Sequence, residues 1–361
     1  MEITKIVITG GPCAGKTTGM SWIQNAIGSR GWRVLFIPET ATELITGGVA
    51  PWTCGSNLDY QKCQVALQLF KEKTFLQAAQ TMKEEKILIV CDRGVMDNRA
   101  YMTDEEFARV LEALGLDEVE LRDGYDGIFH LVTAANGAEE AYTLSNNAAR
   151  TETPEQAREI DNKLIAAWTG HPHLRVIGNE TDFVTKMKRL VAEISSLLGE
   201  PVPMEIERKF LIGYPDLEWL GSLPNCRKVE ISQTYLRSDE GEEVRVRQRG
   251  AGGSYVYYET RKRAINGMKR LEMERRISAD EYRTRLKDAD PLLKPIVKDR
   301  YCLTWDNQYF EIDVFPFWKD RALLEIELSD ENDPVRFPEG LQIIREVTDD
   351  PVYKNRALAA M

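Results

Sequence analysis

Charged residues stand two positions apart in one segment after another of the last third of this chain. Side chains two residues apart share one face of a β-strand, so each set would present its charges on a single face. Apolar residues such as Val244 and Val246 fill the alternate positions. The sets are Glu205, Glu207 and Lys209; Arg245 and Arg247; Lys262; Arg270, Glu272 and Glu274; Lys298 and Arg300; Glu311 and Asp313; and Glu325 and Glu327.

Acidic pairs and basic pairs occupy mostly separate strands of this predicted sheet. A barrel closed from such strands would therefore gather carboxylates and cations in one lumen. Carboxylates at that density need a divalent metal ion, and arginine and lysine at that density need a polyanion. A metal-bound triphosphate satisfies both requirements, so we expect this kind of ligand.

A second candidate site lies near the N-terminus, where the sequence fits G-x-x-x-x-G-K-[ST]. An apolar strand precedes the motif and a helix follows it, which is the context that a phosphate-binding loop requires. Glycines let backbone N–H groups curl around phosphate oxygens, while Lys16 would reach the β- and γ-phosphates and Thr17 would ligate Mg²⁺. The predicted nucleotide-binding residues are Gly10, Gly11, Pro12, Cys13, Ala14, Gly15, Lys16, Thr17 and Thr18.

Two different patterns of apolar residues must position these sites. Residues 1–198 alternate short, continuous apolar runs with amphipathic stretches, which predicts a buried parallel sheet of doubly wound α/β type. The predicted strands cover residues 5–9, 34–38, 87–91, 127–132 and 174–177.

The sequence Gly-Glu-Pro-Val-Pro at 199–203 breaks this pattern, and we predict a domain boundary there. A P-loop NTP-binding domain would occupy residues 1–199, and a second domain residues 203–361. The second domain is mostly period-two strands, with short helices predicted near 216–220 and 279–286. The predicted fold is therefore an α/β doubly wound parallel-sheet domain followed by a mainly antiparallel β-barrel with a few helices.

Whole-chain composition limits the partners of the protein. Its 361 residues carry a formal net charge of −11, and an acidic chain is a poor non-specific binder of nucleic acid. The six cysteines form no CxxC pair, which fits a reducing cytosol and argues against a zinc site. No apolar run approaches the roughly 20 residues that a membrane helix needs, so we expect a cytoplasmic protein without a membrane partner. The sequence does not specify an oligomeric state.

Two predicted strand ends give the first domain a resemblance to the P-loop kinases of nucleosides and small metabolites, including the ribosylnicotinamide kinase type. The second strand is followed by Glu39, and the third by Asp92 and Arg93. Ligands of open α/β sheets bind at the carboxyl ends of strands, which would place both acids beside the γ-phosphate of ATP. The resemblance implies that one acid serves as base or substrate ligand and the other as metal and substrate ligand, in either order. It also implies that Arg93 and Arg150 are nucleotide-binding residues.

The same resemblance implies a lid whose arginine closes on the phosphates. Arg150 is the first candidate for this role and Arg158 is the second. The sequence does not identify the phosphate acceptor.

Residues from about 203 to 359 resemble the CYTH, or triphosphate tunnel metalloenzyme, superfamily. The segment opens with an E-x-E-x-K motif from Glu205 to Lys209, continues through the charged strands in order, and includes the tail from Val347 to Ala359. The resemblance implies a closed antiparallel barrel in which triphosphates are hydrolysed or cyclised with Mg²⁺ or Mn²⁺. It assigns metal ligation to Glu205, Glu207, Glu272, Glu274, Asp313, Glu325 and Glu327, of which Glu272 and Glu274 match one family position. It assigns triphosphate binding to Lys209, Arg245, Arg247, Lys262, Lys298, Arg300 and Lys354.

The combined prediction is a bifunctional enzyme. The barrel would hydrolyse tripolyphosphate or a nucleoside triphosphate, and the P-loop domain would act as an ATP-dependent kinase or NTPase. Direct chemical roles are predicted for Lys16, Glu39, Asp92 and Lys209. Three alternatives use the same residues: a class IV-like adenylyl cyclase, an enzyme that processes RNA ends, and a polyphosphate sensor coupled to a P-loop switch.

Overall fold

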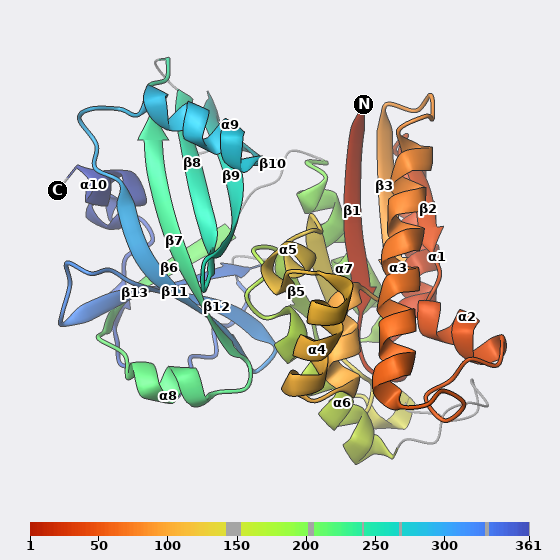
Figure 1. Ribbon diagram of the computed structural model, residues 1–361. Coiled ribbons are helices and arrows are strands. Elements are labelled where there is room, and N and C mark those ends of the chain that lie inside the picture. The colour runs from red at the N-terminus through yellow and green to blue at the C-terminus, as the bar shows by residue number, and fades with distance from the viewer. Residues whose placement is uncertain (142–152, 201–205, 240–241, 267–268, 329–331, 361) are drawn as a thin grey trace. The chain divides into compact units, whose positions relative to one another are not determined.

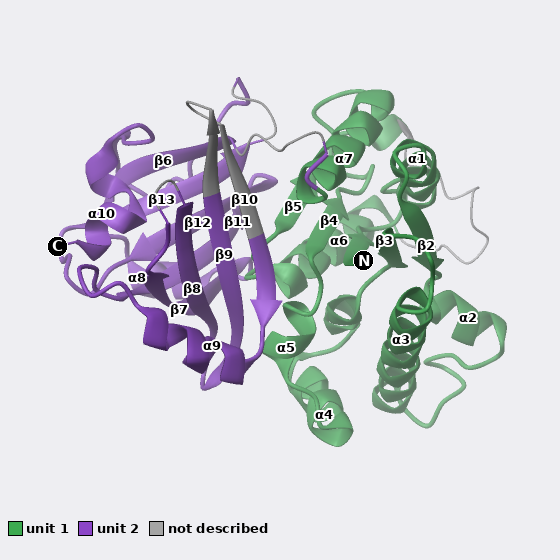
Figure 2. Cartoon of the chain, turned by 90° about the horizontal axis from the view of Figure 1, so that it is seen from above, with its two compact units in different colours: residues 1–198 green, residues 199–361 purple. Residues whose placement is uncertain are grey.

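The computed structural model describes residues 1–141, 153–200, 206–239, 242–266, 269–328 and 332–360. The chain divides into two compact units, Met1–Leu198 and Gly199–Met361 (Figures 1 and 2). Within the described residues, no helix is both long and apolar enough to cross a membrane.

The first unit is built on a five-stranded parallel sheet with the order β2-β3-β1-β4-β5. The central parts of its strands are continuous apolar runs because helices cover both faces, and Ile6, Ile8, Leu88 and Val90 are completely buried. The strands are β1 (Glu2–Thr9), β2 (Arg33–Ile37), β3 (Lys86–Asp92), β4 (Gly127–Leu131) and β5 (Leu174–Ile177). The predicted α/β fold is confirmed.

Helices α1 (Lys16–Gly28) and α7 (Phe183–Leu197) pack together on one face of this sheet, and α3 (Asn57–Ala79) covers the other face (Figure 2). The apolar faces of α1 and α7 close the core over β1, β3 and β4. The other helical elements are α2 (Thr40–Thr46), η1 (Val95–Tyr101), α4 (Asp104–Leu114), α5 (Glu118–Arg122), η2 (Glu139–Ala141) and α6 (Pro154–Trp168). Because β1 is the central strand, the loop that follows it lies between the ends of β3 and β4.

The second unit is an antiparallel sheet with the order β10-β9-β8-β7-β11-β12-β13-β6-β14 (Figure 1). Its strands are β6 (Ile206–Gly213), β7 (Cys226–Leu236), β8 (Glu242–Ala251), β9 (Ser254–Asn266), β10 (Lys269–Ile277), β11 (Ile296–Trp305), β12 (Gln308–Val314), β13 (Arg321–Leu328) and β14 (Ile343–Glu346). The helical elements are α8 (Leu217–Ser222), α9 (Ala279–Arg285), η3 (Leu286–Asp288), η4 (Pro351–Tyr353) and α10 (Asn355–Ala359). The predicted antiparallel fold with a few helices is confirmed.

The strand register sorts the alternating residues onto two faces. Glu325 of β13 lies opposite Lys209 of β6, and Arg300 of β11 lies opposite Asp313 of β12. The alternate positions pack into an apolar core that includes Phe310, Ile312, Leu324 and Ile326. The charged residues therefore face away from that core, as the period-two pattern predicts.

Candidate active sites

The phosphate-binding loop joins the end of β1 to the start of α1. Lys16 is the first residue of α1, and its Nζ donates to the carbonyl oxygens of Gly10 at 3.1 Å and Gly11 at 3.5 Å. Burial, together with nearby Arg93, lowers the pKa of Lys16 to about 8. Thr17 and Thr18 are exposed on the first turn of the helix, where a phosphate or a metal ion can reach them.

Residues that follow β2 and β3 lie on one side of this loop. Glu39 precedes α2 and forms an ion pair with Arg93. Burial raises the pKa of Glu39, but the Arg93 and Lys16 charges outweigh burial and lower it to about 2. Arg93 has a φ of 68°, which turns the chain sharply between β3 and η1. Glu39 is thus fixed as an anion beside the lysine of the loop.

Asp92 is the last residue of β3 and is electrostatically coupled to Lys16, Glu39 and Arg93. Burial raises its pKa above the usual range. Its Oδ1 and the Nη1 of Arg93 are buried, and neither has a hydrogen-bond partner among the described residues. Nη1 of Arg93 still lies 3.7 Å from Asp97 Oδ2, whereas Asp92 Oδ1 can serve a bound ligand, since leaving a buried oxygen unpaired is costly.

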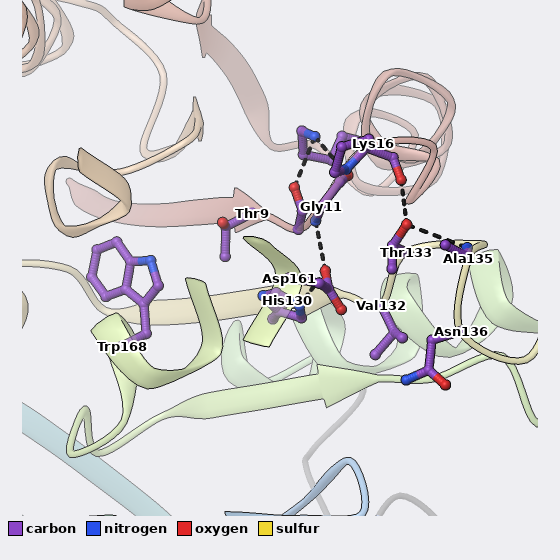
Figure 3. A network of polar contacts seen from close by, with 12 residues as sticks. Thr9, Gly11, Lys16, His130, Val132, Thr133, Ala135, Asn136, Asp161 and Trp168 are labelled. Atoms are coloured by element: carbon purple, nitrogen blue, oxygen red, sulfur yellow. Dashed lines mark hydrogen bonds and ion pairs between the residues drawn. The ribbon is translucent and has the colours of Figure 1, made fainter. Parts of the chain in front are cut away.

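Buried polar residues from β4, the loop after β4 and α6 form hydrogen bonds that hold the phosphate-binding loop (Figure 3). Asp161 of α6 accepts hydrogen bonds from the Gly11 backbone N–H at 2.7 Å and pairs with Nε2 of His130 at 3.0 Å. The Thr133 hydroxyl donates to the carbonyl oxygen of Pro12. These contacts fix the first half of the loop, and no motif in the sequence marks Asp161, His130 or Thr133 as part of the site.

A second buried acid stabilises the strand that leads into the loop. Asp97 of η1 accepts from the Thr9 hydroxyl at 2.8 Å and from the Trp168 indole at 2.6 Å.

Of the two predicted lid arginines, Arg150 lies outside the described residues. Arg158 lies on α6 and donates to the carbonyl oxygen of Ala135 at 2.6 Å. Arg158 is thus held by the loop after β4 in this structure.

The candidate site of the second unit begins on β6. Lys209 Nζ lies 2.7 Å from an oxygen of Glu325 and 3.2 Å from an oxygen of Glu207. Burial lowers the pKa of Lys209, but the two carboxylates raise it above its usual range. Burial raises the pKa of Glu207, and Glu325 and Glu327 raise it further by like-charge repulsion. This end of the site therefore has an excess of negative charge.

Arg300 joins three acids in the middle of the same charged face. Its guanidinium donates to Asp313 at 2.7 Å and to Glu325 at 2.8 Å, and it also contacts Glu311. Lys298 forms a further ion pair with Asp313. Burial lowers the pKa of Lys298, and the Arg300 charge lowers it further. Arg300, Lys298 and Asp313 are all buried, so this is an interior charge network.

Strands β8 to β10 carry a separate group of predicted site residues. Arg247 Nη2 lies 2.8 Å from Glu274 Oε2, which also accepts from the Thr260 hydroxyl at 2.8 Å. Arg245 hydrogen-bonds Tyr235, and the register places Lys262 opposite Glu243. The side chain of Glu272 lies outside the described residues, so the structure describes only Glu274 of the two acids that match one family position.

The acids fit a hard divalent cation by their chemistry, because carboxylate oxygens are the ligands that Mg²⁺ and Mn²⁺ prefer. The raised pKa of Glu207 marks a place where a cation would relieve repulsion. Within the described part of the chain, no three acidic, cysteine or histidine side chains are arranged to hold a metal ion together. Lys209 and Arg300 lie among the carboxylates instead, and Glu205 is outside the described residues.

Two predicted residues are exposed, and two further residues that had no assigned role join the site. Lys354 is exposed at the start of α10, and Glu327 is exposed near the end of β13. Glu311 contacts Arg300. Arg249 is buried, and the charges of both Glu311 and Arg249 act on Tyr309. The period-two pattern placed Glu311 on the charged face, and it could also have identified Arg249, which follows Arg245 and Arg247 at the same spacing.

The protein thus combines a P-loop-type α/β unit with an antiparallel sheet that carries charged side chains on one face, which defines a two-domain α/β plus antiparallel-β class of protein. The AAA domain family matches residues 5–186, and the CYTH domain family matches residues 203–349. The chain therefore belongs to the AAA domain family through its first part and to the CYTH domain family through its second part. The recognition of both parts from sequence is confirmed.

One similar protein and two similar solved structures each match less than half of this chain. An inorganic triphosphatase of Nitrosomonas europaea is 33% identical over 159 residues, which are 43% of this chain and 96% of that protein. A solved structure of an inorganic triphosphatase is 30% identical and covers 44% of this chain and 95% of its own, with a TM-score of 0.31. A solved protein from Pyrococcus horikoshii OT3 is 20% identical and covers 36% of this chain and 81% of its own, with a TM-score of 0.27.

Proposed function

We propose that the second unit hydrolyses a triphosphate, either inorganic tripolyphosphate or a nucleoside triphosphate. The observation that carries this proposal is the interior network in which Lys209, Arg300 and Lys298 alternate with Glu325 and Asp313. Buried ion pairs stabilise a fold poorly compared with apolar packing. A network of this size is better explained by a highly charged ligand, and the relative from Nitrosomonas europaea is an inorganic triphosphatase.

The cations of the network would bind the substrate. Phosphate oxygens would replace carboxylates as partners of Lys209, Arg300, Lys298 and Arg247, and Arg245 would also bind them, since arginine forks suit phosphate geometry. The carboxylates thus released, Glu207 and Glu325 with Glu205, Glu327, Asp313 and Glu274, would ligate the cation. When bound, Mg²⁺ or Mn²⁺ supplies charge neutralisation and an acidified water molecule. A water molecule would attack the terminal phosphorus while the bond from that phosphorus to the bridging oxygen breaks. The products would be orthophosphate, a proton, and either pyrophosphate from tripolyphosphate or a nucleoside diphosphate from a nucleoside triphosphate.

We also propose that the first unit binds ATP and transfers its terminal phosphoryl group to an acceptor or to water. Lys16 and the backbone of Gly10–Gly15 would hold the β- and γ-phosphates, with Thr17 on the metal ion. Glu39, with its pKa of about 2, is suited to hold Arg93 in place and not to accept protons. Asp92, with its raised pKa and an unpartnered oxygen, is the better proton acceptor of the two.

The two activities can be tested separately by phosphorus NMR. The Lys16→Ala protein is given tripolyphosphate, ATP and pyrophosphate in turn, with Mg²⁺ or Mn²⁺ and then with EDTA. We expect metal-dependent release of orthophosphate from tripolyphosphate or ATP. The substitution silences the P-loop, so this release would come from the charged network.

Each other outcome selects one of the alternatives. Pyrophosphate and cyclic AMP from ATP would make the second unit a cyclase. Turnover that persists in EDTA would contradict the metal-dependent mechanism. If all three compounds bind without turnover, the second unit is a polyphosphate sensor. If none is turned over but triphosphate-ended RNA is, the substrate is an RNA end.

A further inference from the structure

The phosphate loop has a charged side and an uncharged side. Glu39, Asp92, Arg93 and Asp97, which come from the β2 and β3 end of the sheet, are the charges that act on Lys16. The terminal phosphate of a bound nucleotide belongs on this side, because the reacting group needs these charges. The ribose and base must then extend toward the β4 and β5 end of the sheet.

An exposed aromatic ring lies on that second side. Phe183 follows the carboxyl end of β5 as the first residue of α7, and 49% of it is exposed. A Cβ built on Gly15 would lie 2.8 Å from Phe183 Cε2, so the ring rests directly on the glycine of the phosphate loop. Val184, the next residue, is also exposed, at 48%. A large apolar surface thus adjoins the loop where a nucleotide would leave it.

We propose that Phe183 is the platform on which the nucleobase of the bound nucleotide stacks. This inference rests on the proposed binding of ATP by the P-loop. Aromatic rings stack on the π-face of any base, and such a contact strengthens binding by about ten- to a hundredfold. The contact with Gly15 sets the ring at a fixed position relative to the phosphates.

Two polar side chains that precede this ring in the chain, Asp182 and Asn179, form hydrogen bonds within the protein. Asp182 accepts from the backbone N–H groups of Val184 and Thr185. The Asn179 amide donates to the carbonyl oxygens of Thr133 and Asn136, and its oxygen accepts from Lys186. These hydrogen bonds occupy polar atoms of Asp182 and Asn179, so the interaction with the base that this proposal assigns is stacking on Phe183.

The test compares a ligand that has a base with one that lacks it. The affinities of Mg-ADP and Mg-pyrophosphate are measured by calorimetry for the unaltered chain and for Phe183→Ala, Phe183→Trp and Phe70→Ala. Phe70 is a second exposed phenylalanine and lies on α3. Each titration is repeated with Lys16→Ala, so that binding elsewhere on the chain can be subtracted.

We expect Phe183→Ala to weaken Lys16-dependent binding of ADP by about ten- to a hundredfold and to leave pyrophosphate binding unchanged. Phe183→Trp should retain ADP affinity, and Phe70→Ala should change neither ligand. Equal losses for ADP and pyrophosphate, or no loss for either, would overturn the platform. No Lys16-dependent binding in the unaltered chain would instead overturn the proposed function of the P-loop, and the inference with it.

Discussion

Lys209 Nζ lies 2.7 Å from Glu325 Oε1 on the neighbouring strand, directly opposite in the register of β6 and β13. Each partner also contacts a further charge, Glu207 for Lys209 and Arg300 for Glu325. The pair therefore links the E-x-E-x-K motif at the start of the second unit to the interior network. It brings together residues 116 positions apart, and both are largely buried.

Replacing Lys209 by alanine should impair both the fold and the proposed chemistry. The substitution removes one of the two cations that contact buried Glu325. Because Arg300 remains, we expect a loss of unfolding free energy smaller than that of an uncompensated buried charge, which is about 3–5 kcal/mol. It also removes a phosphate ligand, so we expect triphosphate turnover to fall by at least about a hundredfold, as for other charged groups that stabilise a transition state. Orthophosphate release and chemical unfolding measure the two effects.

Lys228→Ala is the matched control for this change. Lys228 pairs with Asp299 at 2.8 Å on the same sheet, but both side chains are more than two-fifths exposed. Exposed pairs contribute about 0–1 kcal/mol, so the control should retain stability and turnover. Equal behaviour of the two variants would show that the Lys209 pair has no special part in the site.

Glu207→Gln should separate stability from metal use. Burial and the charges of Glu325 and Glu327 raise the pKa of Glu207, so the uncharged amide relieves repulsion when no metal is bound. We expect the metal-free protein to be at least as stable as the unaltered chain. Turnover should fall, and the Mg²⁺ concentration for half-maximal rate should rise. The control is Glu346→Gln, which removes an exposed partner of Arg208 and should leave the Mg²⁺ dependence unchanged. An unchanged Mg²⁺ dependence in Glu207→Gln would mean that Glu207 is not a metal ligand.

The period-two spacing was sufficient to predict that Arg300, Asp313 and Glu325 share one face, because side-chain direction in a strand depends only on local geometry. Strand order is different. The contact between Lys209 and Glu325 requires β6 to lie beside β13, and local sequence does not encode that pairing. Glu311 received no role because the family resemblance assigned only Asp313 of that pair. The metal and phosphate roles of the individual side chains stay predictions.

The same contrast holds in the first unit. The sequence predicted that Glu39 and Asp92 would lie near Lys16, because the carboxyl ends of parallel strands meet at one edge of the sheet. It did not predict that Asp161 would hold the Gly11 N–H, since a polar residue within a helix usually faces solvent. That contact spans 150 residues and depends on how α6 packs.

Lys16→Ala should abolish ATP turnover by the P-loop and leave metal-dependent triphosphate hydrolysis intact. The lysine is part of the first compact unit, and the charged network belongs wholly to the second. Separate assays with labelled ATP and with tripolyphosphate measure the two rates. Equal loss of both would mean that the two units operate as one coupled machine.

Gly10→Ala should also disable the P-loop, for a different reason. Gly10 has a φ of 143°, and a Cβ there would lie 2.1 Å from the carbonyl oxygen of Leu131. Backbone atoms cannot move aside cheaply, so the loop must distort, and we expect Lys16-dependent ADP binding to be lost. Gly31 also has a positive φ, of 86°, but open space surrounds its Cβ position. Gly31→Ala should therefore retain ADP affinity, and calorimetry distinguishes the two variants.

Lys186 should make the stability of the first unit rise with pH. Burial lowers its pKa from 10.5 to about 8, while its Nζ donates to the carbonyl oxygen of Val132 and to Asn179, each at 2.7 Å. Between these two pH values the unfolded chain binds more protons at Lys186 than the folded chain does, so the unfolding free energy increases with pH. Relative to Lys186→Met, we expect the unaltered chain to gain up to about 3 kcal/mol between pH 7.5 and 10.5.

Chemical unfolding of both proteins across this pH range measures the difference, from which the titrations common to the two chains cancel. Lys188→Met, on the exposed face of the same helix, serves as the control and should show a constant difference. The sign of the change with pH is decisive, because a lysine stabilised in its charged form would make the protein less stable as the pH rises. A difference for Lys186→Met that falls with pH would mean that this lysine is held in the charged form, and a flat difference would mean that folding does not shift its pKa; either result would contradict the prediction.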